Sequence, residues 1–119
     1  MYKRPLAFVC VPENKKDDIQ SIVTKEYCKT LLKHGFTPIA PYLFFSELID
    51  TRLPEQRAEL ITMKNVLIRK SRIMFVCGDV ITDEMKDEML YARDVGLTVV
   101  TIDSMEKIEQ YLTKAKTED

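Results

Sequence analysis

The sequence predicts an α/β fold of three layers, in which a parallel, flavodoxin-like or Rossmann-like sheet of four to five strands lies between helices. Short apolar runs of strand length alternate with longer amphipathic stretches along the chain, and this alternation implies parallel strands joined by right-handed crossovers. A strand order of 2-1-3-4 is the most economical arrangement, and no internal repeat or linker divides the chain. We therefore expect one domain over residues 1–119, with a ligand cleft at the carboxyl ends of the first and third strands.

Four apolar runs, at 6–11, 36–40, 73–77 and 97–102, are predicted as the strands. The first run is apolar without a break, which is typical of a strand covered on both faces. We expect helices over about 18–34, 55–71, 82–95 and 104–115. Asp17 or Asp18 is suited to cap the first helix, Gly35 to end it and Pro54 to begin the second. The stretch 41–53 is aromatic and irregular, and we expect a short helical turn within it at 46–50.

Composition and charge exclude several classes of partner. The 119 residues include 18 Lys+Arg and 19 Asp+Glu, so the formal net charge is −1, and 45% of the residues are apolar. A balanced charge rules out a strong electrostatic footprint for a nucleic acid polymer or an anionic membrane, and no run approaches the roughly 20 apolar residues of a membrane span. A small anionic ligand remains compatible with this charge.

The cysteines indicate a reducing compartment. Cys10, Cys28 and Cys77 are odd in number and lack metal-ligand spacing, and two of them lie in apolar runs. A disulfide framework is therefore not expected, and neither is a metal site. The loop after the first strand, at 12–16, contains no glycine, so dinucleotide binding through that turn is not expected either. We predict a cytoplasmic protein without metal or cofactor.

The helix predicted over 82–95 contains a carboxylate on its apolar side. At about 100° per residue, Glu88 falls within the arc that Met85, Met89 and Ala92 define. A carboxylate on an inward face is costly unless it is paired or hydrogen-bonded. Near the ligand edge of the sheet, such a group is a candidate nucleophile or acid–base catalyst. The alternative is a structural role, in which Glu88 lies at the margin of the apolar stripe or pairs with a lysine or arginine.

Other residues near the predicted cleft have ordinary structural explanations beside the functional ones. Asp79 follows the third strand directly, where binding carboxylates occur, but a turn-forming aspartate fits equally. Thr82 is a suitable helix N-cap, and Met85 is suited to the core. The aromatic cluster at 42–45 suits either a base-like ligand or a core or oligomer contact. His34, at the end of the first helix, is explained by the helix dipole.

Taken in order, a set of short motifs resembles a known group of proteins. The motifs are Val11-Pro12, His34-Gly35, Ala40-Pro41-Tyr42-Leu43-Phe44-Phe45, Pro54-Glu55-Gln56-Arg57, Val76-Cys77-Gly78-Asp79 and Thr82-Asp83-Glu84-Met85-Lys86-Asp87-Glu88-Met89-Leu90-Tyr91-Ala92, followed by Gly96. This order resembles small bacterial and phage-encoded domains of unknown function that are related to the nucleoside 2-deoxyribosyltransferases. The match extends over nearly the whole chain.

The resemblance implies a nucleoside or nucleotide 2-deoxyribosyltransferase-like or N-glycosidase-like activity. Glu88 is then the catalytic nucleophile at the anomeric carbon of a 2-deoxyribosyl group, by the logic of a retaining glycosidase. It also implies a nucleoside or nucleotide as the small-molecule partner, no metal, and a homo-oligomer in which a neighbour completes the site. The residues expected to bind the substrate are Pro12, Glu13, Asp79, Thr82 and Met85.

Two departures from the family pattern fall at the proposed site. Glu84 stands where the pattern has glycine, and its bulk and charge should repel a phosphate at that helix start. The loop at 12–15 lacks the Tyr-Arg-Gly that follows proline in the pattern. These departures predict an altered specificity or a non-catalytic relative. A nucleotide-ligand binding or sensor domain and a structural oligomerisation module therefore remain alternatives.

Overall fold

The sheet has four parallel strands, and the computed structural model describes residues 4–13 and 18–117 of the chain. The strands are β1 (Leu6–Cys10), β2 (Thr37–Ile39), β3 (Ile73–Cys77) and β4 (Thr98–Ile102), hydrogen-bonded in the order β2-β1-β3-β4. The helices are α1 (Asp18–Lys33), α2 (Pro41–Phe45), α3 (Pro54–Lys70), α4 (Asp83–Asp94) and α5 (Met105–Thr117). The α/β fold, the parallel sheet and the strand order 2-1-3-4 are therefore confirmed.

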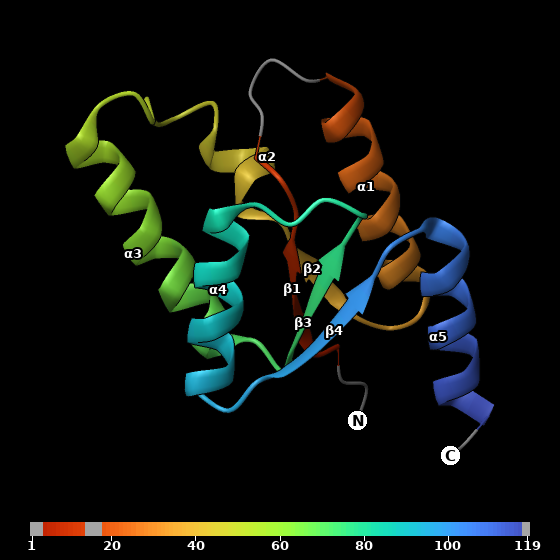
Figure 1. Ribbon diagram of the computed structural model, residues 1–119. Helices are drawn as coiled ribbons and strands as arrows, with labels where there is room; N and C mark the ends of the chain where they lie inside the picture. Colours follow the sequence, from red (N-terminus) through yellow and green to blue (C-terminus); the bar gives the residue numbers. More distant parts are fainter. Residues whose placement is uncertain (1–3, 14–17, 118–119) are drawn as a thin grey trace.

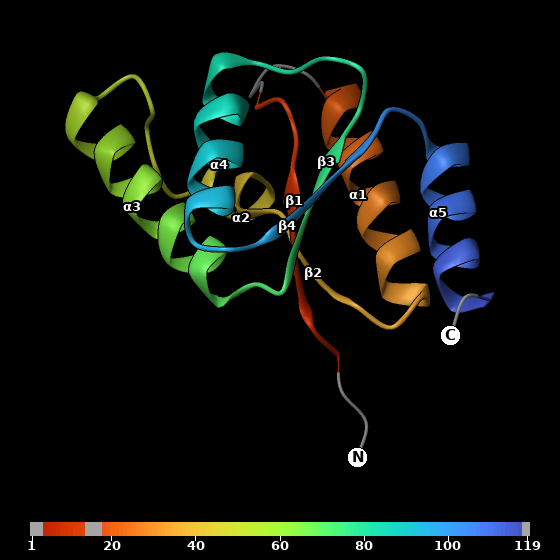
Figure 2. The same cartoon turned by 60° about the horizontal axis from the view of Figure 1, so that its bottom comes forward.

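Helices cover both faces of this sheet, as Figure 1 and Figure 2 show: α1 and α5 lie on one side, and α3 and α4 on the other. Alternate side chains of the central strands enter two separate cores. On β1, Ala7 and Val9 pack with α1 and α5, whereas Phe8 and Cys10 pack with α3 and α4. The unbroken apolar run of β1 is therefore explained, because both faces of this strand are buried.

The short helix in the aromatic segment lies earlier than expected. The sequence predicted a helical turn at 46–50, but the helix is α2, which begins at Pro41 and ends at Phe45. Proline at the first helical position has a backbone φ that already suits a helix, and its missing N–H has no partner to lose there. The segment 46–48 that follows forms turns. The strand before it is also shorter than predicted, at Thr37–Ile39.

The start of α4 is fixed by Thr82. The Met85 amide donates a hydrogen bond to Thr82 Oγ1 at 3.2 Å, and the Thr82 amide donates to Met85 Sδ at 3.4 Å. The predicted N-cap is therefore confirmed. The sequence also predicted Asp17 or Asp18 as the cap of α1. Asp17 and the side chain of Asp18 lie outside the part of the chain that the structure describes.

Positive backbone φ at Gly78 turns the chain away from the end of β3. Its φ is +103°, and its amide donates to the Ile102 carbonyl of β4 at 2.8 Å. A residue with a Cβ rarely adopts this conformation.

Along the described ranges 4–13 and 18–117, no helix has the length and apolar character that crossing a membrane requires.

Candidate functional site

A cavity of about 480 Å³ lies between α3 and α4, with further walls from α2 and from the chain that follows β1. Val11 and Glu13 reach it from the end of β1, Tyr42 from α2, and Thr82 from the start of α4. Its position at the carboxyl end of β1 agrees with the general location of ligand sites in open parallel sheets. Ligand sites commonly have volumes of about 300–1,000 Å³, so the cavity is large enough for a small molecule.

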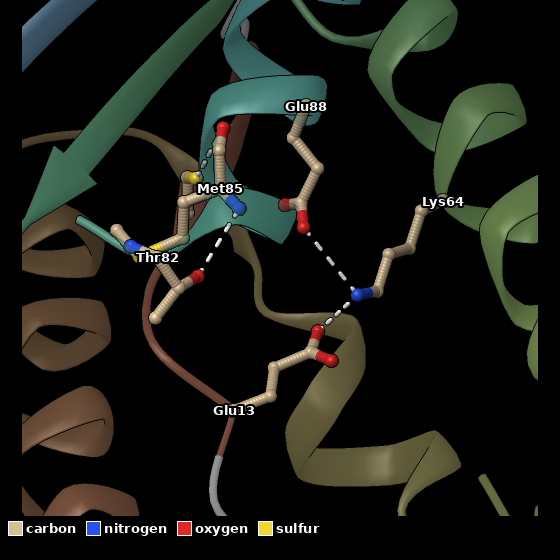
Figure 3. A network of polar contacts seen from close by, with 6 residues as sticks. Glu13, Lys64, Thr82, Met85 and Glu88 are labelled. Atoms are coloured by element: carbon tan, nitrogen blue, oxygen red, sulfur yellow. Dashed lines mark hydrogen bonds and ion pairs between the residues drawn. The ribbon is translucent and has the colours of Figure 1, made fainter.

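One ammonium group at the cavity wall contacts two carboxylates. Figure 3 shows Lys64 of α3 between Glu88 of α4 and Glu13 of the chain after β1. Lys64 Nζ donates to Glu88 Oε2 at 3.4 Å and forms an ion pair with Glu13 Oε1. Lys64 is 5% exposed and Glu88 is 9% exposed. We call these three residues the carboxylate–lysine cluster.

Helical spacing places the cluster at the interface between α3 and α4. Glu88 follows Met85 by three residues and precedes Ala92 by four, and both of these neighbours are buried in the core. Lys64 lies four residues after Leu60 and four before Ile68, which are also buried. Residues three or four apart share a helix face, so each charged side chain projects from the apolar face of its helix. Burial of the two apolar faces forces the charges to meet.

Burial and neighbouring charges set the proton affinity of Glu88. Removal from water raises the pKa of its carboxyl group from the ordinary 4.5 to about 7. The Lys64 ammonium opposes this rise, whereas repulsion from Glu13 adds to it, and a hydrogen bond from the Cys10 thiol opposes it again. A carboxyl group with a pKa near neutrality exchanges a proton readily at physiological pH, which suits acid–base or nucleophilic chemistry.

The partners of Glu88 are perturbed in turn. Burial disfavours the charged form of Lys64, but attraction to Glu88 and Glu13 outweighs burial and raises the pKa of the ammonium group above its ordinary value. Burial first, and then the Glu88 charge, raise the pKa of the Cys10 thiol well above its usual range. The thiol is therefore protonated at neutral pH, and its Sγ also lies 4.0 Å from the Met85 carbonyl oxygen. A protonated, buried thiol is not a nucleophile.

The structure brings together only part of the predicted site. Glu88, Glu13 and Thr82 line the cavity. Met85 lies at the same helix start, but its side chain is buried in the core. Pro12 is half-buried beside Glu13 and is outside the cavity lining.

Asp79 lies away from the cavity. It is exposed on the loop between β3 and α4, and it does not line the cavity. Its charge acts instead on Tyr27 of α1, where it contributes, after burial and the charges of Cys77 and Asp103, to a raised pKa of the phenol. The structure therefore does not bring Asp79 to the cavity that the carboxylate–lysine cluster borders.

Two cationic residues of the site were not identified from the sequence. A helical wheel of α3 could have identified Lys64, because this residue falls between Leu60 and Ile68 on the apolar face. Arg57 also lines the cavity from the first turns of α3, where its Nε donates to the Thr51 carbonyl at 3.0 Å. The Pro-Glu-x-Arg motif included Arg57, but nothing in the motif indicated that its side chain faces a cavity.

The α4 wall of the cavity is acidic. Glu84 and Asp87 line it together with Glu88 and Tyr91. Glu84 is the residue that stands in the place of glycine in the resembled pattern, and its side chain is exposed at the cavity. Within residues 4–13 and 18–117, no three His, Cys, Asp or Glu side chains are grouped so that they could hold a metal ion.

The fold and the cluster define an open α/β protein with a cavity of about 480 Å³ beside a buried glutamate. The chain belongs to the family described as Domain of unknown function (DUF7768), which matches residues 5–102. This range contains all four strands and the complete carboxylate–lysine cluster. A comparison with curated proteins found no match.

Proposed function

We propose that this protein is a nucleoside or nucleotide 2-deoxyribosyltransferase-like or N-glycosidase-like enzyme, in which Glu88 is the nucleophile. The observation that carries the proposal is the position of Glu88, a buried carboxylate on the apolar face of α4 that lines a cavity of about 480 Å³. The resemblance of the motif around Glu88 to the deoxyribosyltransferase pattern supplies the reaction class. Fold kinship alone does not establish an activity, so the proposal depends on this residue.

The proposed reaction has two balanced steps. First, a Glu88 carboxylate oxygen bonds to the anomeric carbon of a 2-deoxyribosyl group as the bond from this carbon to the base nitrogen breaks. The base leaves with the bonding electron pair and takes up a proton. Second, an acceptor base or water attacks the same carbon, releases Glu88 and loses a proton. This is the double displacement of a retaining glycosidase, with an oxocarbenium-like transition state.

The walls of the cavity suit such a substrate. Tyr42 is 8% exposed and forms part of one wall, so we place the base against its ring. Glu13 and Thr82 supply oxygen atoms to the cavity lining, and we assign them to contacts with the sugar. Retaining enzymes use two carboxyl groups about 5–5.5 Å apart. Glu13 and Glu88 both contact the Lys64 ammonium, so two carboxyl groups lie close together in this cavity.

We also propose that the protein is a homo-oligomer. Phe44 is 59% exposed, and Leu48 and Leu53 follow it on the segment between α2 and α3 with similar exposure. Exposed apolar side chains grouped on one segment are typical of a contact surface. This segment adjoins the cavity through Ser46 and Thr51, so a neighbouring copy bound there would also approach the substrate.

A product assay tests the enzymatic proposal. The protein is incubated with a panel of 2′-deoxynucleosides and their monophosphates, with and without an acceptor base, and chromatography detects free base or exchanged nucleoside. We expect product from the natural sequence, none from Glu88→Gln, and undiminished product from Asp94→Asn, which alters an exposed carboxylate on the same helix. Absence of product from the folded natural protein across the panel would contradict the proposal.

A second candidate function is a nucleotide-ligand binding or sensor domain without turnover. The observation that favours it is Glu84, whose carboxylate lines the cavity where the resembled pattern has glycine. This departure from the catalytic pattern favours loss of turnover, and the added bulk and negative charge favour a nucleoside over its phosphate as the ligand. Calorimetric binding of a deoxynucleoside without product formation would support the sensor. A stable oligomer that binds no nucleoside would support the third alternative, a structural oligomerisation module.

A further inference from the structure

Within the described residues, the Lys64 ammonium contacts both Glu88 and Glu13. It lies 3.4 Å from Glu88 Oε2 and pairs with Glu13 Oε1, while 5% of the lysine is exposed. Burying a lysine is costly, and its natural alternative at this position is an apolar residue, since Leu60 and Ile68 flank it on the same helix face.

Stability alone is a weak reason to retain such an ion pair. Replacement of a buried ion pair by apolar residues of similar volume is often neutral or stabilising, because the desolvation penalty offsets the attraction. The cluster also contains two carboxylates and one ammonium, so it is not a neutral pair. A buried ion pair and an excess of carboxylates over ammonium groups are unusual for a purely structural contact. They are expected in a site that needs a carboxylate held in its charged form.

Charged and titratable groups reach Glu88 from every neighbouring element. Cys10 approaches it from β1, Glu13 from the chain after β1, and Lys64 from α3. Glu84 and Asp87, on α4 itself, line the same cavity, as do Arg57, Tyr42 and Tyr91. Of these side chains, Lys64 makes the ion pair with Glu88, whereas Glu13 repels its charge.

We propose that Lys64 is the positioning residue of this site: its ammonium group, shared between Glu88 and Glu13, favours the ionised form of Glu88 and directs its carboxylate along the cavity wall. The proposal rests on the proposed function insofar as it concerns catalysis. It adds that the nucleophile depends on a cation from the neighbouring helix, which a lone carboxylate in an apolar pocket would lack. Burial, attraction to Lys64 and repulsion from Glu13 together set the pH at which Glu88 becomes ionised.

The proposal predicts a specific pattern in the pH dependence. In Lys64→Met, Glu88 should ionise at a higher pH, so kcat at neutral pH should fall at least tenfold and recover partly as the pH is raised. KM should change less than kcat, because Lys64 acts through Glu88. Lys64→Arg retains the positive charge and should restore most of the natural pH profile. A merely structural role would lower kcat equally at all pH values in proportion to the folded fraction.

The test that does not need activity is a direct titration of Glu88. The protein is labelled with carbon-13 at the glutamate side-chain carboxyl carbons, and the Glu88 signal is assigned by its absence in Glu88→Gln. We expect the midpoint of its titration to rise by at least one pH unit in Lys64→Met and to remain unchanged in Lys70→Met, which alters an exposed lysine of the same helix. An unchanged midpoint in folded Lys64→Met would overturn the proposal.

A second variant keeps the test decisive if Lys64→Met does not fold. Glu13→Gln removes the competing carboxylate at the partly exposed end of the cluster. The Glu88 midpoint should then fall, because Lys64 serves one carboxylate instead of two and the repulsion is gone. An unchanged midpoint in Glu13→Gln would also overturn the shared-cation proposal.

The proposed function and this inference fail in different ways. If the midpoints shift as expected but no panel compound reacts, the enzymatic proposal fails and the role of Lys64 in holding the Glu88 charge stands. If product forms but Lys64→Met has the natural pH profile and the natural midpoint, the enzyme is real and the inference is wrong.

Discussion

Lys64 Nζ and Glu88 Oε2 lie 3.4 Å apart across the interface of α3 and α4, and both side chains are almost completely buried. This contact joins two helices through side chains that lie 24 residues apart in the chain. It also joins the wall of the cavity to the core, since Leu60 and Met85 occupy neighbouring positions on the same two helices. Substitution of either residue therefore tests both the stability of the fold and the proposed chemistry.

The raised pKa of Glu88 predicts a stability that falls with pH. The folded pKa of about 7 exceeds the ordinary value of 4.5, so the folded protein binds more protons than the unfolded chain between these values. The free energy of unfolding should therefore decrease as pH rises from about 4.5 to 7, by on the order of 2–3 kcal/mol from this group. Urea unfolding of the natural protein and Glu88→Gln at pH 5 and pH 8 isolates the effect. An equal pH dependence in both proteins would contradict it.

Removal of one partner of the buried ion pair should be costly. In Lys64→Met, Glu88 loses its counter-ion, and breaking a buried pair from one side typically costs about 3–5 kcal/mol. The loss should be smaller at pH 5, where Glu88 is protonated, than at pH 8. Thermal and urea unfolding measure the difference, and Lys70→Met should change the free energy of unfolding by less than about 0.5 kcal/mol. A pH-independent loss would show that Lys64 acts through packing alone.

Replacement of the whole pair should recover stability without recovering chemistry. The double variant Lys64→Met with Glu88→Leu fills the interface with apolar groups, and such exchanges are often neutral or stabilising by about 1–4 kcal/mol. We expect a free energy of unfolding at or above that of the natural protein and no product in the assay. The comparison is made at pH 8, where the penalty for the buried Glu88 charge is fully present. A double variant as unstable as Lys64→Met would refute the electrostatic account of the interface.

The Thr82 side chain should contribute to stability through the start of α4. Thr82→Ala removes the acceptor of the Met85 amide, and loss of a threonine N-cap costs about 1 kcal/mol. Thr113→Ala, at an exposed position of α5, is the control for the same change of side chain. If Thr82 binds substrate as well, Thr82→Ala also raises KM. Denaturation curves give the first quantity and steady-state kinetics the second, and equal unfolding energies for the two variants would exclude the cap as a stabilising contact.

The charge and the bulk of Glu84 can be separated by two substitutions. Glu84→Gln removes the negative charge at nearly constant size, whereas Glu84→Gly removes both. If charge excludes phosphate from the cavity, both variants should bind deoxynucleoside monophosphates more tightly than the natural protein does, and binding of uncharged deoxynucleosides should change little in Glu84→Gln. Titration calorimetry measures both ligands. Tighter binding in Glu84→Gly alone would assign the effect to bulk.

The sequence predicted the fold and the inward position of Glu88 because both depend on local periodicity. The alternation of apolar runs determines parallel strands with crossovers, and the wheel of α4 places Glu88 among Met85 and Ala92 whatever it packs against. The sequence did not show which residue pairs with Glu88. Lys64 occupies an apolar face of its own helix, but only the packing of α3 against α4 shows that these two faces meet.

The position of Asp79 depends on the direction of the loop after β3, which the strand order does not specify. Both Asp79 and Glu13 follow central strands at the same edge of the sheet, so the sequence placed them together. Gly78 turns the chain with a positive φ, and Asp79 lies outside the cavity lining, whereas Glu13 lines the cavity and pairs with Lys64. The short helix was likewise misplaced, because the sequence indicated a helical turn at 46–50, whereas α2 begins at Pro41.

The central claim is that Glu88 forms a covalent bond to a deoxyribosyl group, and mass spectrometry tests it most directly. The protein is mixed with the 2′-deoxynucleoside that gives most product, quenched in acid within the first turnover, and examined intact and after proteolysis. We predict a mass increase of one deoxyribosyl residue on the peptide that contains Glu88, absent from Glu88→Gln. Product formation with no adduct in the natural protein, or an adduct that persists in Glu88→Gln, would contradict the claim.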